Sequence, residues 1–139
     1  MKKSRSCEDL MSTSLVTLRE TDTLSQAIRE MTLGSFRHMP VVDANERVVG
    51  IVSSHDVVAS LEKHADKPLG EIMNRHIVTV RPDTPASVAV GLMIDQKLNC
   101  VPVVSDEGRL EGLLTATDFL VVAHQALTGG RIERAPHEI

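Results

Sequence analysis

The chain has 139 residues, of which 42% are apolar, and this length and composition predict one ordinary globular body. Its formal net charge of −4 and its lack of Trp and Tyr argue against a nucleic-acid partner, which would need basic surface and aromatic stacking platforms. No apolar run approaches the roughly 18 residues of a membrane span, and none follows the basic N-terminus as in a signal peptide. We therefore expect a soluble cytoplasmic protein without a membrane partner, in which Cys7 and Cys100 are reduced thiols.

The first predicted elements are a short strand and a helix. The β-prone run 15–18 forms the strand, and the capping residues 21–23 precede the helix, which we expect Gly34 to end in the left-handed conformation. Apolar residues follow the i, i+3, i+4, i+7 spacing of one buried helical stripe, namely Leu24, Ala27, Ile28 and Met31.

A hairpin and a second helix come next. A polar turn separates two apolar runs, 39–42 and 48–52, which is the pattern of two antiparallel strands. Ser53 is placed to cap the following helix, which carries Val57 and Leu61 on its apolar face. Residues 62–69 are then expected to form a linker.

The succession of elements then recurs, because residues 70–123 align with residues 8–61 without a gap at an offset of 62 positions. The second copy predicts a strand at 77–80, a helix starting near 86, strands at 101–104 and 110–114, and a helix that Thr115 caps. Residues 124–139 are expected to form the end of that helix, stopping at Gly129-Gly130, and a polar tail. The identical pairs are Met11/Met73, Val16/Val78, Thr17/Thr79, Arg19/Arg81, Ser25/Ser87, Ala27/Ala89, Met31/Met93, Pro40/Pro102, Val41/Val103, Val42/Val104, Arg47/Arg109, Gly50/Gly112 and Asp56/Asp118.

This duplication predicts an α+β fold in which two βαββα repeats pack about a pseudo-twofold axis. A unit of about 60 residues is marginally stable alone, so the two copies should close over a shared core. A long period that occurs only twice argues against a solenoid. Clefts between the copies should then come in related pairs.

The helix near residues 86–96 is more apolar than its counterpart, since Val88, Leu92 and Ile94 replace polar residues of the first copy. Gly91 inside this helix costs about 1 kcal/mol relative to Ala, which is easier to understand where another backbone approaches closely. We therefore expect a homodimer through helices that include this one. Deeper burial within the monomer is the alternative.

A candidate binding motif lies at the start of the last helix of each repeat. Each copy has a glycine, two apolar residues, a hydroxyl residue, two further residues and an aspartate, from Gly50 to Asp56 and from Gly112 to Asp118. Free amides at a helix N-terminus favour a phosphate, and an acidic residue one turn on can accept both hydroxyls of a ribose. The alternative is a capping box that only starts the helix.

In these motifs, and in their order and duplication, the chain resembles a tandem pair of cystathionine β-synthase (CBS) domains. The resemblance covers most of residues 8–123 and rests on Val16-Thr17 and Val78-Thr79, Met39-Pro40-Val41-Val42 and Val101-Pro102-Val103-Val104, and the two Gly-to-Asp segments. It implies a regulatory module, without catalytic activity, whose two clefts bind adenosine nucleotides such as AMP, ADP or ATP, or another adenosyl ligand. No cofactor is implied.

The resemblance also implies which residues line each cleft. Ser53 and Asp56 in one cleft, and Thr115 and Asp118 in the other, would hold phosphate and ribose. The adenine would lie against backbone around Thr17 and Thr79 and against residues preceding or flanking the two prolines, which are Arg37, His38, Met39, Asn99, Cys100 and Val101.

We further expect each cleft to combine the aspartate of one repeat with the other repeat's pre-proline residues. Arg37 and His38 would then join Asp118, whereas Asn99 and Cys100 would join Asp56. A guanidinium binds phosphate more strongly than an amide does, so this pairing predicts tighter nucleotide binding at Asp118.

Two functions follow from the sequence. The first is a stand-alone adenine-nucleotide sensor that acts on an unidentified effector protein, and the second is a dimerising interaction scaffold with no nucleotide. We expect no catalytic residues, because no nucleophile lies beside a base in any motif, and no metal site, because the histidines show no ligand spacing. Cys100 is expected to be a small buried hydrophobe.

Overall fold

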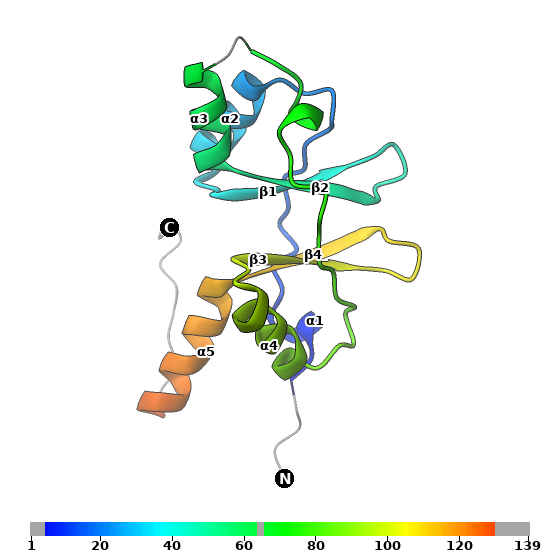
Figure 1. Ribbon diagram of the computed structural model, residues 1–139. Helices are drawn as coiled ribbons and strands as arrows, with labels where there is room; N and C mark the ends of the chain where they lie inside the picture. Colours follow the sequence, from blue (N-terminus) through cyan, green and yellow to red (C-terminus); the bar gives the residue numbers. More distant parts are fainter. Residues whose placement is uncertain (1–4, 64–65, 130–139) are drawn as a thin grey trace.

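The structure is a computed structural model that describes residues 5–63 and 66–129. It consists of two similar halves, one above the other, with a two-stranded hairpin of each half in the middle and the helices outside (Figure 1). The expected polar tail at 131–139 lies outside the described residues. The elements are α1 (Cys7–Leu10), α2 (Leu24–Gly34), β1 (His38–Val42), β2 (Val48–Ser53), α3 (Ser54–Lys63), the 3-10 helix η1 (Leu69–Glu71), α4 (Ala86–Gln96), β3 (Cys100–Val104), β4 (Leu110–Thr115) and α5 (Ala116–Thr128).

Both hairpins have the same register, so the sequence repeat is also a structural repeat. His38 lies opposite Ser53 in the first hairpin, and Cys100 lies opposite Thr115 in the second. Each hairpin has one irregularity, after Val41 and after Val103. The two predicted hairpins are therefore confirmed.

Pairs of isolated backbone bridges reveal the pseudo-twofold relation between the halves. The bridge between Ile51 and Asn74 recurs, with partners exchanged between repeats, as the bridge between Leu113 and Ser12. Ile51 and Leu113, and likewise Ser12 and Asn74, are related by the 62-residue offset of the sequence. The α+β fold of two repeats about a pseudo-twofold axis is confirmed.

The leading strands are shorter than expected. Residues 15–18 and 77–80 were predicted to be strands, but each contributes one parallel bridge, Leu18 to Val41 and Val80 to Val103. The Leu18 amide donates to the Pro40 carbonyl oxygen, and the Leu18 carbonyl oxygen accepts from the Val42 amide. Val80 makes the equivalent pair of hydrogen bonds with β3, so each segment pairs with its hairpin through a single residue. The βαββα description holds with this correction.

The starts and ends of the helices partly match the expectation. The Thr23 side chain accepts a hydrogen bond from the Gln26 amide, as expected of a cap, and Gly129 ends α5 in the left-handed conformation. The prediction for Gly34 is wrong, because Ser35 takes the left-handed conformation with φ 57°. Gly34 is instead the last helical residue, where a Cβ atom would collide with the Phe36 ring.

Each half of the molecule completes its core with residues from the start of the other repeat. Leu69 and Met73, which precede the second leading segment, pack into the core of the first half and are 0% and 7% exposed. Cys7 packs into the core of the second half, with Met11 against it. The sequence predicted neither α1 nor this exchange, and it placed Leu69 in a linker.

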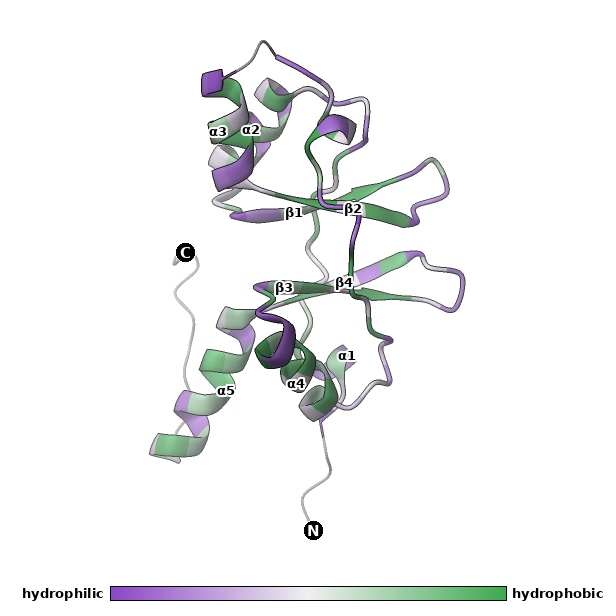
Figure 2. Ribbon diagram, in the orientation of Figure 1, coloured by the Kyte–Doolittle hydropathy of each residue, from purple (hydrophilic) through white to green (hydrophobic). Residues whose placement is uncertain are grey.

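The outer helices differ between the halves. α2 packs against α3, whereas α5 does not pack against α4 in the same way and extends away from the second hairpin (Figure 1). Figure 2 shows that α4 and α5 are apolar over much of their length. Their exposed apolar side chains include Val88 (50% exposed), Ile94 (74%), Leu120 (68%) and Leu127 (86%). Among the described residues, no helix is long and apolar enough to cross a membrane.

Candidate functional site

The first site begins at the turn from β2 into α3. β2 ends at Ser53, whose hydroxyl oxygen accepts a hydrogen bond from the Asp56 amide at 3.2 Å and so fixes the first turn of α3. The Asp56 side chain is exposed, and within residues 5–63 and 66–129 no hydrogen bond or ion pair engages its carboxylate. This carboxylate is therefore available to a ligand.

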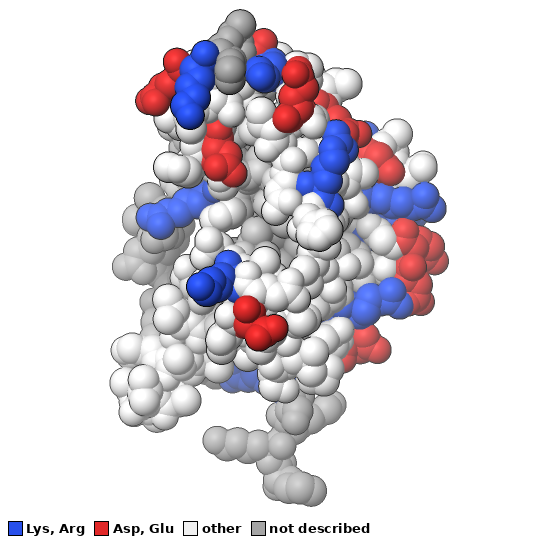
Figure 3. Space-filling view, viewed as in Figure 1, with Lys and Arg blue, Asp and Glu red and all other residues white. Residues whose placement is uncertain are grey.

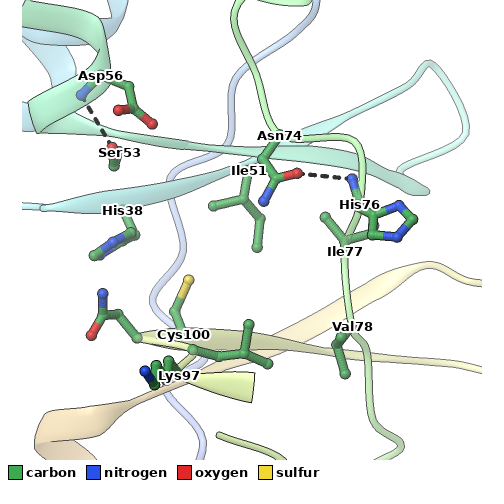
Figure 4. A pocket seen from close by; sticks show the side chains of 12 residues that line it. His38, Ile51, Ser53, Asp56, Asn74, His76, Ile77, Val78, Lys97 and Cys100 are labelled. Atoms are coloured by element: carbon green, nitrogen blue, oxygen red, sulfur yellow. Dashed lines mark hydrogen bonds between the residues drawn. The ribbon is translucent and has the colours of Figure 1, made fainter. Parts of the chain in front are cut away.

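Asp56 and Ser53 open onto a cavity of about 280 Å³ between the two halves of the molecule (Figure 4). Its size is close to the lower limit of typical small-molecule sites. The lining comes from both hairpins, from the start of α3, from the segment after η1 and from the residues between α4 and β3, namely His38, Ile51, Ser53, Asp56, Asn74, His76, Ile77, Val78, Lys97, Leu98, Asn99 and Cys100.

The cavity lining is chemically divided. Ile51, Ile77 and Val78 form an apolar wall, on which a flat base could lie. Asp56, Ser53 and His38 lie together on the side of α3, and Lys97 lies across the opening from them (Figure 4). This arrangement can hold a ligand with one apolar ring system and one polar, hydroxyl-rich or anionic part.

Two titratable groups in the cavity are shifted towards their neutral forms. Burial lowers the pKa of His38 below 6.5, Asp56 partly opposes this by raising the pKa, and Arg37 lowers it further. Burial raises the pKa of Cys100 to about 11, so this thiol remains protonated at neutral pH. Cys100 is free and buried, in accord with the expected small hydrophobe and with low thiol reactivity.

The equivalent turn in the second half has different surroundings. The backbone amide and the hydroxyl of Thr115 donate to the same Asp118 carboxylate oxygen, at 2.7 and 3.2 Å. Asp118 is 8% exposed and completes a capping box at the start of α5. The capping alternative that the sequence left open therefore describes Asp118, whereas Asp56 does not cap α3 with its carboxylate.

Asp118 also borders a second cavity, of about 330 Å³, between α1 and α5. Its other lining residues are Arg5, Asp9, Leu10, Met11, Ser12, Val121, Val122 and Gln125. Apart from Asp118, none of the residues proposed from the sequence lies in it.

The cavity at Asp56 brings together several of the predicted residues. Asn99 and Cys100 join Asp56 and Ser53 there, in agreement with the predicted cross-repeat pairing. His38 was expected beside Asp118 but lines the Asp56 cavity, because it pairs with Ser53 across the β1–β2 ladder.

The remaining predicted residues lie outside both cavities. Arg37 is exposed, and its carbonyl oxygen accepts a hydrogen bond from the Ser54 amide at 2.8 Å. Met39 and Val101 are core residues that are 1% and 0% exposed. Thr17 and Thr79 line neither cavity, although Ile77 and Val78 just before Thr79 do.

Sequence reasoning missed several residues of the cavity. Asn74 and His76 reach it because the segment after η1 crosses to β2, where Asn74 pairs with Ile51. The identities Gly50/Gly112 and Met73/Met11 could have indicated this crossing, because each methionine packs on the glycine of the other repeat. No sequence pattern pointed to Lys97. Among the described residues, no group of three or more His, Cys, Asp or Glu could hold a metal ion.

Known proteins share the sequence pattern and the fold of this chain. The model of the CBS domain family matches the chain twice, over residues 7–63 and 69–124. Homoserine O-acetyltransferase of Methanohalophilus mahii is 35% identical over 78% of the chain, and inosine-5′-monophosphate dehydrogenase of Methanocaldococcus jannaschii is 30% identical over 84%. The chain covers only 22% and 23% of these two relatives.

Several solved structures match this chain over nearly their whole length. The CBS domain pair of protein MJ0100, in complex with 5′-methylthioadenosine and S-adenosyl-L-methionine, has a TM-score of 0.83 at 26% identity and covers 89% of this chain and 99% of its own. A candidate acetoin utilization protein (AcuB) from Vibrio cholerae has a TM-score of 0.81 at 33% identity, covering 91% and 95%. CBSX2 in complex with AMP has a TM-score of 0.78 at 26% identity, covering 88% and 98%.

Proposed function

The chain belongs to the CBS domain family as a tandem pair of its domains, and on that premise we propose that it is a regulatory module that binds an adenine nucleotide in the Asp56 cavity. The observation that carries this proposal is the exposed Asp56 carboxylate beside the Ser53 hydroxyl, at the edge of a cavity with an apolar wall. Similar structures were solved with AMP and with adenosyl ligands, which supports the choice of ligand class.

The proposed binding mode follows the division of the cavity lining. The adenine lies against Ile51, Ile77 and Val78, and the Asp56 carboxylate accepts hydrogen bonds from the ribose hydroxyls. The phosphate lies near Ser53 and the first amides of α3, where the helix dipole favours an anion.

The Asp118 turn is the weaker candidate for a second ligand. Its carboxylate already accepts hydrogen bonds from the amide and hydroxyl of Thr115, and a ribose would have to replace or share them. Arg37, on which the expectation of tighter binding at Asp118 depended, lines neither cavity. We therefore reverse the expected ranking and propose tighter binding at Asp56.

Thermal unfolding with AMP, ADP, ATP and S-adenosylmethionine in turn tests this proposal. A ligand at 100 times its dissociation constant adds about 2.7 kcal/mol, which raises the melting temperature on the order of 10 °C. We expect at least one of these ligands to raise it, and Asp56→Ala to abolish the rise. No shift with any of the four would contradict the proposal, and an unchanged shift in Asp56→Ala would move the ligand elsewhere.

We further propose that the module has no catalytic role and that an effector protein responds to its occupancy. The ligand lies between the two halves, so binding favours the arrangement of the halves that places Asp56 and Lys97 around it. An effector that distinguishes this arrangement would respond to nucleotide concentration.

We also propose that the chain forms a homodimer. If the cavities of this homodimer bind no nucleotide, the protein would serve as an interaction scaffold. Val88, Gly91 and Ile94 form an exposed apolar stripe on α4, and no described atom lies within 4 Å of a Cβ added at Gly91. Residues 119–128 of α5 contain no Asp, Glu, Lys or Arg, and the end of this helix is white on the face that Figure 3 shows. Self-association without any ligand-induced stabilisation would favour the scaffold.

A further inference from the structure

We propose that Lys97 makes the Asp56 cavity selective for adenosine ligands that carry phosphate, over uncharged ones. The inference rests on the proposed function, because it concerns the ligand of the same cavity. Lys97 belongs to no motif of the sequence, and its role follows from three structural observations.

The first observation is that the backbone directs residue 97 towards the cavity. Lys97 ends α4 in the left-handed conformation, with φ 55° and ψ 47°, and its side chain lines the cavity opposite His38 (Figure 4). Ser35 ends α2 with a similar φ of 57°. The helix-end geometry therefore belongs to both repeats, and the cationic side chain is particular to the second.

The second observation is the charge of the lining. Among residues 5–63 and 66–129, Lys97 is the only Lys or Arg that lines this cavity, and Asp56 is the only Asp or Glu. The pKa of His38 is lowered by burial, which favours its neutral form. Without Lys97 the lining would carry the negative charge of Asp56, which repels a phosphate bound at the start of α3. Lys97 offsets that charge.

The third observation is that Lys97 has no competing partner in the part of the chain that the structure describes. The ion pairs found there join Arg19 to Glu46, Arg75 to Glu20 and Arg81 to Asp106, and none involves Lys97. Its ammonium group can thus turn to a phosphate without breaking an existing contact. A neutral adenosine gains nothing from this group.

Titration calorimetry with AMP and with adenosine tests the inference, since the two differ only in the phosphate. We expect the unmodified chain to bind AMP about 10-fold or more tightly than adenosine, as one charge-assisted contact allows. Lys97→Gln should weaken AMP binding about 10-fold and change adenosine binding less than about twofold. Lys63→Gln makes the same charge change at the end of α3, outside the cavity, and should alter neither.

The outcomes separate this inference from the proposed function. Equal affinity for AMP and adenosine, or AMP binding that Lys97→Gln does not weaken, would overturn the role of Lys97 while the nucleotide site stands. Loss of AMP affinity in both lysine variants would show a long-range charge effect and would also overturn it. If neither compound binds, the proposed function fails, and the inference fails with it.

Discussion

Asp56 and Asp118 occupy equivalent positions in the repeat, but their carboxylates have different surroundings. The Asp56 carboxylate is exposed at the cavity, and that of Asp118 accepts hydrogen bonds from Thr115. We expect Asp118→Ala to lower the free energy of unfolding by about 1 kcal/mol, as loss of a helix cap does. Asp56→Ala should change it by less than about 0.5 kcal/mol, because surface substitutions usually do.

Urea unfolding of both variants, with AMP titrations of each, measures the two effects. The nucleotide affinity should fall more in Asp56→Ala than in Asp118→Ala. Equal loss of stability in both variants would contradict the contrast between the two carboxylates. Asp118→Asn is the control for the cap, since an amide oxygen can still accept from Thr115.

His38 makes stability depend on pH, because burial lowers its pKa in the folded protein. As the pH falls below about 6.5, the unfolded chain binds a proton that the folded chain binds only at lower pH. The free energy of unfolding should therefore decrease from pH 7.5 to pH 5.5 and level off below the folded-state pKa. Asp56, which partly raises the pKa of His38, limits the decrease.

Urea unfolding of the unmodified chain and of His38→Gln between pH 7.5 and 5.5 tests this expectation. The other histidines are present in both proteins, so the difference between the two curves isolates His38. The variant should lose less stability on acidification. Parallel curves would show that His38 titrates equally in the folded and unfolded states.

At the scale of elements, two glycines have opposite surroundings. A Cβ atom added at Gly50, in β2, would lie 2.7 Å from the Met73 sulfur and 3.1 Å from the Asn74 carbonyl oxygen. A Cβ atom added at Gly91, inside α4, would meet no described atom within 4 Å. Gly50→Ala should thus destabilise the fold by about 1–3 kcal/mol, whereas Gly91→Ala should stabilise it by about 0.5–1 kcal/mol.

Urea unfolding at a protein concentration where the chain is monomeric measures both glycine effects. Met73→Ala combined with Gly50→Ala is the informative control, because removal of the Met73 side chain should relieve part of the collision. A neutral Gly50→Ala would show that Met73 moves away without cost.

The elements also show what the sequence could predict. The hairpins and the helix starts were predicted, because alternating apolar runs, polar turns and capping residues are local signals. The exchange of Leu69 and Cys7 between the halves was not, since burial by a distant repeat leaves no local pattern. Ser35 and Lys97 take left-handed conformations that glycine would have signalled.

The candidate site was likewise predictable only where a local sequence motif marked it. Ser53 and Asp56 could be predicted because they belong to a repeated motif whose residue types suit phosphate and ribose. The cross-repeat pairing placed Asn99 and Cys100 beside them. The different surroundings of Asp56 and Asp118 could not be predicted, because both belong to the same motif. Only side-chain packing separates a carboxylate that caps a helix from one that faces a cavity.

At the scale of the whole molecule, the apolar stripes of α4 and α5 predict self-association. Ile94→Glu places a charge on the α4 stripe, where the native side chain is 74% exposed. We expect it to weaken the dimer at least about 10-fold and to change monomer stability by less than about 0.5 kcal/mol. Leu33→Glu is the matched control, since Leu33 is also 74% exposed but lies on α2.

Sedimentation velocity over a range of concentrations measures this association. The unmodified chain and Leu33→Glu should both shift towards a larger species at higher concentration, and Ile94→Glu should not. A monomer at all concentrations would remove the proposed homodimer. Equal effects of both substitutions would place the contact elsewhere.

Met73 and Met11 each pack on the other repeat, and this exchange bears on whether one repeat can fold without the other. A fragment that stopped after α3 would lack Leu69 and Met73, and one that began at η1 would lack Cys7 and Met11. Each fragment alone would expose an unfilled interior, while the two mixed together could supply each other's missing residues. The peptide connection between the repeats thus raises the local concentration of two mutually dependent pieces, and we expect neither repeat to fold alone.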